Sequence, residues 1–151
     1  MKRAVRTLHT PIDLKEIASL KAGDKVNLTG EILVFRDQVH RILCEMINKG
    51  LSLPFSLKEA VVYHCGPRPS GKGMPVGSAG PTTASRMDKF TEPLLEAGVA
   101  MTIGKGNRSP EIAELLKKHS AVYMVAVGGT GALIAKCVTS STIIAFPDLG
   151  A

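Results

Sequence analysis

The segment that decides the fold class is KVNLTGEILVFRDQVHRILCEMINK, residues 25–49. Its first part, Lys25 to Phe35, is rich in apolar and β-branched residues that partly alternate with polar ones, which predicts a strand. In its second part, Asp37 to Lys49, apolar residues recur at helical spacing, with Asp37 as the predicted N-cap and Gly50 as the predicted end. The segment therefore predicts a strand that leads directly into a helix.

The same alternation continues along most of the chain. Further strands are predicted at residues 60–65, 100–103, 121–127 and 142–146, and further helices at residues 83–97, 109–119 and 130–137. The helix at 83–97 is expected to be interrupted or restarted near Pro93 and to end at Gly98, and the helix at 109–119 begins with Ser109 as N-cap and Pro110 at its first position. Alternating strands and helices are typical of an α/β domain with at least partly parallel pairing.

Length and composition indicate one domain. The chain has 151 residues, of which 44% are hydrophobic, so it can bury one core but is too short for two ordinary domains. No apolar run approaches the roughly 20 residues that span a bilayer. The basic start at residues 1–10 lacks the apolar stretch of a secretory signal. We therefore expect a cytoplasmic protein without a membrane association.

The net charge of the chain does not identify a class of partner by itself, but together with the low aromatic content it narrows the choice. Lysine and arginine number 19 against 13 acidic residues, a net charge of +6, which suits nucleic acid, an acidic protein surface and small anions about equally. Aromatic residues make up only 4% of the chain, and there is no tryptophan. Because single-stranded nucleic acids are bound largely by stacking on aromatic rings, we do not expect a nucleic-acid partner.

The three cysteines, Cys44, Cys65 and Cys137, are widely spaced and form no C-x-x-C pair. This spacing indicates neither a disulfide framework nor a local metal site. We therefore expect reduced thiols with packing roles, and no metal ligands in this chain.

Three polar clusters lie where predicted strands end. They are Arg36-Asp37 with His40, the loop GSAGPTTASR at residues 77–86, and Gly104-Lys105-Gly106-Asn107. Each also has a simple structural interpretation: a helix cap with a solvated His40, an ordinary capped loop, and an exposed turn. The Gly-, Pro- and Ser-rich stretch at residues 66–83 is similarly either a linker or a site.

Taken together, the clusters favour a binding site. Arg36, Arg86 and Lys105 place three cations at the ends of three different strands, where open α/β sheets commonly bind ligands. Hydroxyl and imidazole groups for proton transfer or orientation lie nearby: Thr82, Thr83 and His40. The residues alone therefore predict a site for a small dianion, either a carboxylate or a phosphate.

At these same residues the sequence resembles a known family. The string GSAGPTTASRMD, residues 77–88, resembles the beta-type region of class I fumarases and tartrate dehydratases. Further matches are Leu28-Thr29-Gly30, Arg36-Asp37 with His40, Leu53-Pro54-Phe55, Gly66-Pro67, residues 103–106, Gly128-Gly129 and Asp148-Leu149-Gly150. The resemblance implies a swivelling β/β/α domain with a mixed, partly parallel sheet over residues 1–151, normally followed by a further short tail that this chain lacks.

The resemblance also implies a chemistry. It indicates the beta subunit of an iron–sulfur hydro-lyase that reversibly hydrates or dehydrates a small dicarboxylate, fumarate/malate or tartrate/oxaloacetate. A [4Fe-4S] cluster would be carried by an alpha partner subunit, so this chain would be inactive alone. The expected assembly is a hetero-oligomer or a homo-oligomer of the beta chain. A stand-alone domain that binds small carboxylates or phosphates is the alternative.

Matching the family motif residue by residue implies individual roles. The implied substrate-binding residues are Arg36, Thr82, Thr83, Arg86 and Lys105. Thr82 is the candidate for proton transfer, with Lys105 assisting it and His40 as the alternative acid or base. Arg108 lies beyond the matched motif, and we expect it to be solvated.

Overall fold

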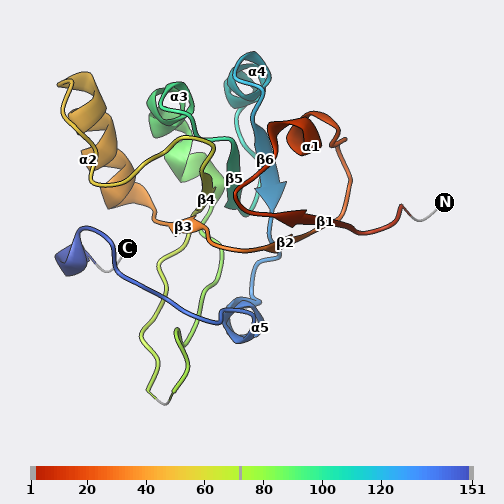
Figure 1. Cartoon of the computed structure of the whole chain (residues 1–151), viewed down its shortest axis with the longest axis vertical. Coiled ribbons are helices and arrows are strands. Elements are labelled where there is room, and N and C mark those ends of the chain that lie inside the picture. The colour runs from red at the N-terminus through yellow and green to blue at the C-terminus, as the bar shows by residue number, and fades with distance from the viewer. Residues whose placement is uncertain (1–2, 72, 150–151) are drawn as a thin grey trace.

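Parallel strand pairing organises the chain in the computed structural model, which describes residues 3–71 and 73–149. Gly150 of the Asp148-Leu149-Gly150 match lies outside the described residues, as do residues 1–2, 72 and 151. The larger sheet has the order β3 (Leu33–Val34), β4 (Val61–Tyr63), β5 (Met101–Gly104) and β6 (Val122–Val125), and each neighbouring pair is parallel. A second parallel pair joins β1 (Arg6–His9) to β2 (Val26–Thr29). The predicted α/β class is therefore confirmed (Figure 1).

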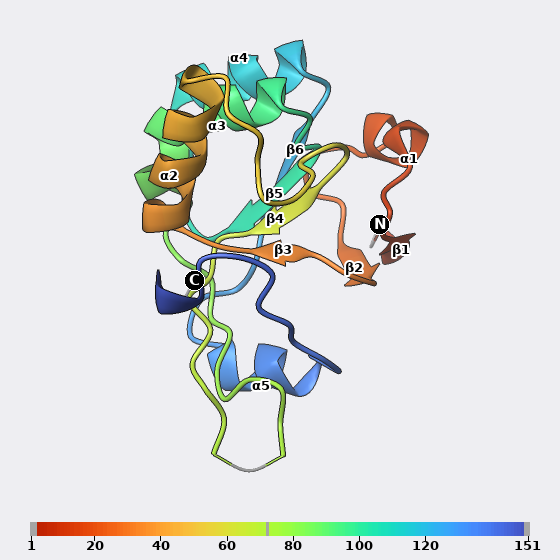
Figure 2. The same cartoon turned by 60° about the vertical axis from the view of Figure 1, so that its left-hand side comes forward.

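The elements form three layers, which the alternation along β4 explains. Successive strand residues point to opposite faces. Val62 belongs to the core under the helices α2 (Asp37–Asn48), α3 (Asp88–Glu96) and α4 (Pro110–Lys118), whereas Val61 packs with Leu8 and Ile17 of β1 and α1 (Leu14–Ala18). Figure 2 shows the helical layer on one side of the large sheet and the β1–β2 unit on the other. The layering is small sheet, large sheet, helices.

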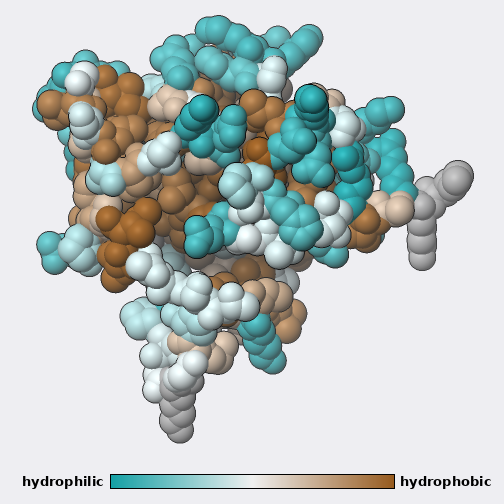
Figure 3. Space-filling model, in the orientation of Figure 1, coloured by the Kyte–Doolittle hydropathy of each residue, from teal (hydrophilic) through white to brown (hydrophobic). Residues whose placement is uncertain are grey.

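The helices pack through amphipathic faces. In α2, the buried residues Val39, Leu43 and Cys44 recur at the spacing of one helical stripe, and Gly50 follows the helix at a φ of 66°. Helix α3 lies between α2 and α4. In the space-filling view, hydrophilic side chains cover α4 at the top, while hydrophobic side chains gather over the middle of this face (Figure 3). No helix in the described residues is both long and apolar enough to span a bilayer.

The predicted strand at residues 25–35 is wrong as a single element. It is divided into β2 and β3, which belong to different sheets. The division falls near Gly30, which has a φ of 113°, and a Cβ atom there would lie only 3.0 Å from the backbone oxygen of Thr10. Only glycine fits both the conformation and the space, so the chain turns here from one layer to the other.

Two further predictions are wrong in detail. Residues 142–146 form no strand, and Ile143 and Ile144 are exposed; the segment leads to η2 (Pro147–Leu149). The predicted helix at residues 83–97 consists of the short 3₁₀ helix η1 (Ala84–Met87) followed by α3, so its break precedes Asp88, while Pro93 lies inside α3. Elements β1 and α1, each of five residues or fewer, were not predicted.

The carboxyl ends of the large sheet support a smaller subdomain. Helix α5 (Gly131–Lys136) packs beside the chain that leaves β4, around Tyr63, Cys65, Val76, Ala79 and Ala135. The Tyr63 hydroxyl donates a hydrogen bond to the backbone oxygen of Ala79 at 2.6 Å. This end of the molecule extends away from the helical layer in both views (Figures 1 and 2).

Candidate active site

A cavity of about 320 Å³ lies at the carboxyl ends of β3, β4 and β5. It is lined by Arg36, Gly66, Arg68, Ser78, Gly80, Pro81, Thr82, Thr83, Arg86 and Lys105. All five residues that the sequence predicted to bind substrate are among them. The lining contains four cationic side chains and no acidic one, so the cavity suits an anion.

Backbone hydrogen bonds insert residues 81–84 between the ends of β4 and β5. The Thr82 N–H donates to the His64 oxygen at 2.7 Å, and the Lys105 N–H donates to the Thr82 oxygen at 3.1 Å. The Ala84 N–H then donates to the Lys105 oxygen at 2.9 Å. Thr82 and Lys105 are therefore held side by side by the main chain, and Thr82 is only 8% exposed.

Gly104 permits this close approach. A Cβ atom at Gly104 would lie 2.9 Å from the Cβ of Ala84 and 3.1 Å from Nδ1 of His64. Both distances are shorter than ordinary carbon contacts, so a larger residue would push residues 82–84 away from β5. The glycine before Lys105 thus has a packing role that fixes the neighbouring Thr82.

Arg36 lies across the backbone of Gly66. A Cβ atom on Gly66 would lie 2.6 Å from Nη2 and 2.7 Å from Nε of Arg36. The guanidinium group therefore occupies the space that a side chain at position 66 would need. This contact directs Arg36 from the start of α2 toward the cavity.

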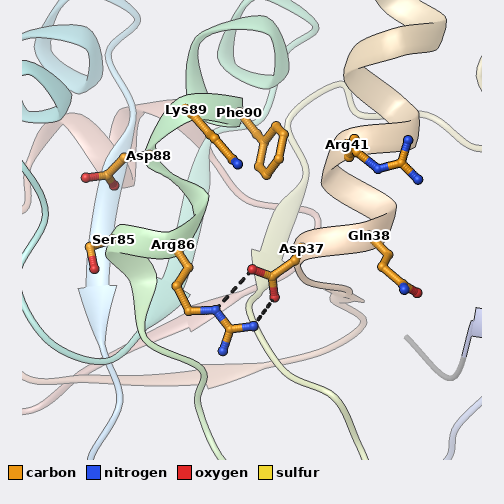
Figure 4. A pocket seen from close by; sticks show the side chains of 8 residues that line it. All are labelled: Asp37, Gln38, Arg41, Ser85, Arg86, Asp88, Lys89 and Phe90. Carbon is orange, nitrogen blue, oxygen red and sulfur yellow. Dashed lines mark hydrogen bonds and ion pairs between the residues drawn. The ribbon is translucent and has the colours of Figure 1, made fainter.

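Arg86 is held by Asp37 (Figure 4). Nε and Nη2 of Arg86 donate to the two carboxylate oxygens of Asp37, at 3.0 and 2.6 Å. The prediction that Asp37 is the N-cap of its helix is wrong: Arg36 occupies that position, and Asp37 is the first helical residue. From this position its carboxylate accepts both hydrogen bonds from Arg86.

The other cations of the cavity lack acidic partners. Within the described part of the chain, no carboxylate forms an ion pair with Arg36, Arg68 or Lys105. Arg68 was not predicted as a site residue. The sequence held a clue to its role, because Arg68 comes soon after the strand predicted at residues 60–65, in the same loop that supplies Thr82. The cavity therefore presents more positive charge than the sequence analysis indicated.

His40 does not line the cavity. It is 1% exposed and lies beneath the site, with its ring centroid 5.1 Å from that of His64 and 4.7 Å from that of Phe35. Its Nδ1 is 2.8 Å from the Arg36 backbone oxygen, which can only accept, so Nδ1 carries the proton. Burial lowers the pKa of His40 to about 4 and that of His64 to about 3. The interpretation of His40 as a solvated helix residue is therefore wrong.

Arg108 is not solvated either, contrary to expectation. Its side chain is 5% exposed and forms an ion pair with Asp88 at 2.6 Å. It also donates to the Thr91 hydroxyl, and its guanidinium lies 5.4 Å from the centroid of the Tyr123 ring. Because the Ser109 N–H donates to the same Asp88 carboxylate at 3.1 Å, Arg108 joins the starts of α3 and α4.

Comparison with known proteins identifies the family of this chain. The family model of the fumarase C-terminus matches residues 2–151. The chain belongs to the fumarase C-terminus family. The resemblance inferred from the GPTT-containing loop is thereby confirmed.

Relatives of this fumarase C-terminus domain are longer proteins. Fumarate hydratase 2 of Leishmania major is 37% identical over 147 residues, which cover 95% of this chain and 26% of the relative. The anaerobic class I fumarate hydratase of Escherichia coli K12 is 36% identical over 139 residues, which cover 91% and 25%. The chain thus spans about a quarter of these enzymes. The putative L(+)-tartrate dehydratase subunit beta of Methanocaldococcus jannaschii is 34% identical over 137 residues, which cover 89% of this chain and 70% of that subunit.

The cysteines do not fit an iron–sulfur cluster. Cys44 and Cys65 are buried in different elements and Cys137 is exposed. Burial raises the pKa of the Cys65 thiol to about 11, which disfavours the thiolate that binds iron. Among the described residues, no group of three or more His, Cys, Asp and Glu side chains could hold a metal ion. We therefore assign no cluster ligand to this chain.

Proposed function

We propose that this chain is the beta subunit of a hydro-lyase that reversibly hydrates a small dicarboxylate. The observation that carries the proposal is the acid-free cavity in which Arg36, Arg86 and Lys105 converge around Thr82. The names of the relatives, fumarate hydratase and tartrate dehydratase subunit beta, support this reaction class. The substrate pair would be fumarate and malate, or tartrate and oxaloacetate.

The cations suit the charge that develops during the reaction. Elimination of water from a 2-hydroxy dicarboxylate removes a proton from the carbon next to one carboxylate, and this places additional negative charge on that carboxylate. Fixed cations that face the developing charge stabilise it more than they stabilise the substrate. In this role Arg36, Arg86 and Lys105 would bind the two carboxylates, and the Thr83 hydroxyl would add a donor.

Thr82 is the proposed proton-transfer residue. A hydroxyl is a poor base unless its deprotonated form is stabilised. The main chain holds Thr82 next to Lys105, and an adjacent ammonium group favours an alkoxide. His40 is a weaker candidate, because it is buried, neutral and absent from the cavity lining.

The remaining part of the enzyme would come from a partner. We propose an alpha subunit that carries a [4Fe-4S] cluster, since the cysteines of this chain do not fit one; when bound, the cluster would supply a Lewis acid for the substrate hydroxyl. The assembly would be cytoplasmic, and either a hetero-oligomer or a homo-oligomer of the beta chain. In this assembly, this chain would bind the substrate carboxylates through its cations and transfer the proton, and the alpha subunit would hold the cluster.

The alternative is a stand-alone domain that binds small carboxylates or phosphates. The cation set lies entirely within this chain, and phosphate would also fit an acid-free cavity lined by glycine and serine. Binding without catalysis would then be the whole function.

The decisive experiment mixes the full-length gene product with a cluster-bearing alpha subunit under anaerobic conditions. Ultraviolet absorbance then follows formation or loss of the dicarboxylate double bond. We expect activity from the mixture and none from either chain alone, and a purified beta chain that is colourless and free of iron. Turnover by this chain without partner or iron would refute the subunit assignment. An inactive mixture, together with tight phosphate binding by this chain, would favour the alternative.

A further inference from the structure

We propose that Asp37 is a positioning residue for the substrate. By holding one edge of the Arg86 guanidinium, it sets the direction in which Arg86 meets a substrate carboxylate. The inference rests on the proposed function, and neither the family motif nor the names of the relatives assign this role to Asp37.

Asp37 occupies only part of the Arg86 guanidinium. A guanidinium group carries five N–H donors in a fixed planar fork. Asp37 accepts from Nε at 3.0 Å and from Nη2 at 2.6 Å, so the Nε edge of Arg86 is occupied. Figure 4 shows the third nitrogen, Nη1, pointing away from Asp37. The edge formed by Nη1 and Nη2 therefore remains for a second carboxylate, in a plane that Asp37 fixes.

The pair lies between two cavities. Arg86 lines the cavity of about 320 Å³ described above, called here the cation cavity, and also a second cavity of about 590 Å³. Asp37 lines only the second one (Figure 4). The Asp37 carboxylate thus orients Arg86 from outside the cation cavity. From this side it adds no acidic group to the cavity lining, where it would repel a dianion at short range.

The Asp37–Arg86 pair also connects two segments of the site. Asp37 directly follows Arg36 at the start of α2, and Arg86 lies in η1, which directly follows Thr83. One ion pair therefore joins the two segments that supply four of the proposed substrate-binding residues: Arg36 from one, and Thr82, Thr83 and Arg86 from the other. A negative charge in the first turn of α2 is also favourable to the helix dipole.

Stability alone does not account for the pair. The side chains of Arg86 and Asp37 are 54% and 33% exposed, and ion pairs at such exposure contribute little to folding. The same helix carries another exposed pair, Arg41 with Glu45, joined by one hydrogen bond of 2.7 Å. That pair offers a matched control, because neither of its members lines the cation cavity.

The test uses the assembled enzyme with Asp37→Asn, Glu45→Gln, Arg86→Lys and the double variant Asp37→Asn/Arg86→Lys. An asparagine side chain can accept only one of the two hydrogen bonds, so Arg86 regains rotational freedom. We expect Asp37→Asn to raise both KM and the inhibition constant of succinate, a non-reacting dicarboxylate, by about three- to tenfold. Glu45→Gln should leave both constants unchanged, and the double variant should be no worse than Arg86→Lys alone, since Asp37 acts through Arg86.

A melting measurement separates orientation from folding. We expect Asp37→Asn to melt within about 2 °C of the native assembly, because an exposed pair is lost. If Asp37→Asn binds succinate as tightly as the native assembly or more tightly, the inference is overturned and the proposed function stays intact. The same holds if the fold-changes of Asp37→Asn and Arg86→Lys multiply in the double variant. A native assembly that neither turns over nor binds succinate would overturn the proposed function and this inference with it.

Discussion

The guanidinium group of Arg36 fills the position that a side chain on Gly66 would take. The two residues come from different strand ends, Arg36 after β3 and Gly66 after β4. They meet because those strands are parallel neighbours in the sheet. A glycine at position 66 is therefore required by the site, even though its backbone conformation does not demand one.

Replacing Gly66 with alanine should displace Arg36 from the cavity. A Cβ atom would lie 2.6 Å from Nη2 of Arg36, and the end of a long side chain can move aside at little cost. We expect the free energy of unfolding to change by no more than about 1 kcal/mol, while kcat/KM of the assembled enzyme falls about tenfold or more. Urea unfolding and steady-state kinetics measure the two effects. Gly71→Ala, at a loop position where a Cβ would meet nothing within 4 Å, is the control.

Replacing Thr82 with alanine should slow turnover more than it weakens binding. The hydroxyl is proposed to transfer a proton, a contribution of roughly a hundredfold to ten-thousandfold in rate. We therefore expect kcat to fall by that order with KM nearly unchanged. Thr7→Ala, an exposed position on β1, should retain native kinetics. A large rise in KM with native kcat would instead assign Thr82 to binding.

Replacing Arg86 with lysine should damage turnover far more than the same change at Arg3. Both side chains are more than half exposed and each pairs with an aspartate, but only Arg86 lines the cation cavity. Lysine keeps the charge and loses the planar fork, which should cost about 1.5 to 3 kcal/mol of transition-state stabilisation, or roughly tenfold to a hundredfold in kcat/KM. Equal losses for the two variants would remove Arg86 from the site.

Folding stability should decrease as the pH falls below about 6.5. His40 and His64 have pKa values of about 4 and 3 in the folded chain, so between these values and about 6.5 the unfolded chain binds more protons. Each histidine can lower the free energy of unfolding by up to about 1.4 kcal/mol per pH unit in that interval, and neither contributes above it. Urea unfolding at several pH values tests this. His64→Gln should flatten the dependence, whereas His9→Gln, at an exposed position, should not.

Replacing Arg108 with alanine should destabilise the fold. The Arg108 side chain is buried and compensates the charge of Asp88, and loss of one partner of a buried pair costs about 3 to 5 kcal/mol. Thermal or urea unfolding of the isolated chain measures this without any partner. A native melting temperature would contradict the role of Arg108 as a link between α3 and α4.

Local sequence signals predicted those elements whose boundaries are encoded locally. Helix α2 was found because its apolar stripe ends at Gly50, and α4 because Pro110 stands at its first position. The division of residues 25–35 between two sheets depends on pairing with β1 and β4, which lie elsewhere in the sequence. Residues 142–146 have the composition of a strand, but no strand in the described part of the chain pairs with them.

The candidate site follows the same rule. Arg36 and Lys105 could be grouped because each follows a strand end, and parallel strands bring those ends together. Arg86 lies instead in η1, after the long loop that leaves β4. The contact of Arg86 with Asp37 spans 49 positions along the chain and could not be foreseen. The burial of His40 could have been predicted from the sequence, because His40, Leu43 and Cys44 lie on one helical stripe, at spacings of three and four residues.

The path between Cys65 and Pro81 leaves the sheet and returns to it, closed by bridges between Cys65 and Pro81 and between Arg68 and Ser78. Thr82 is fastened to β4 and β5 only after this return, so its anchors do not depend on the tip of the excursion. Changes near the tip are therefore expected to leave the position of the Thr82 hydroxyl unaltered. The loop length between Arg68 and Ser78 should therefore be open to change without moving Thr82, Thr83 and Lys105 in the cavity lining.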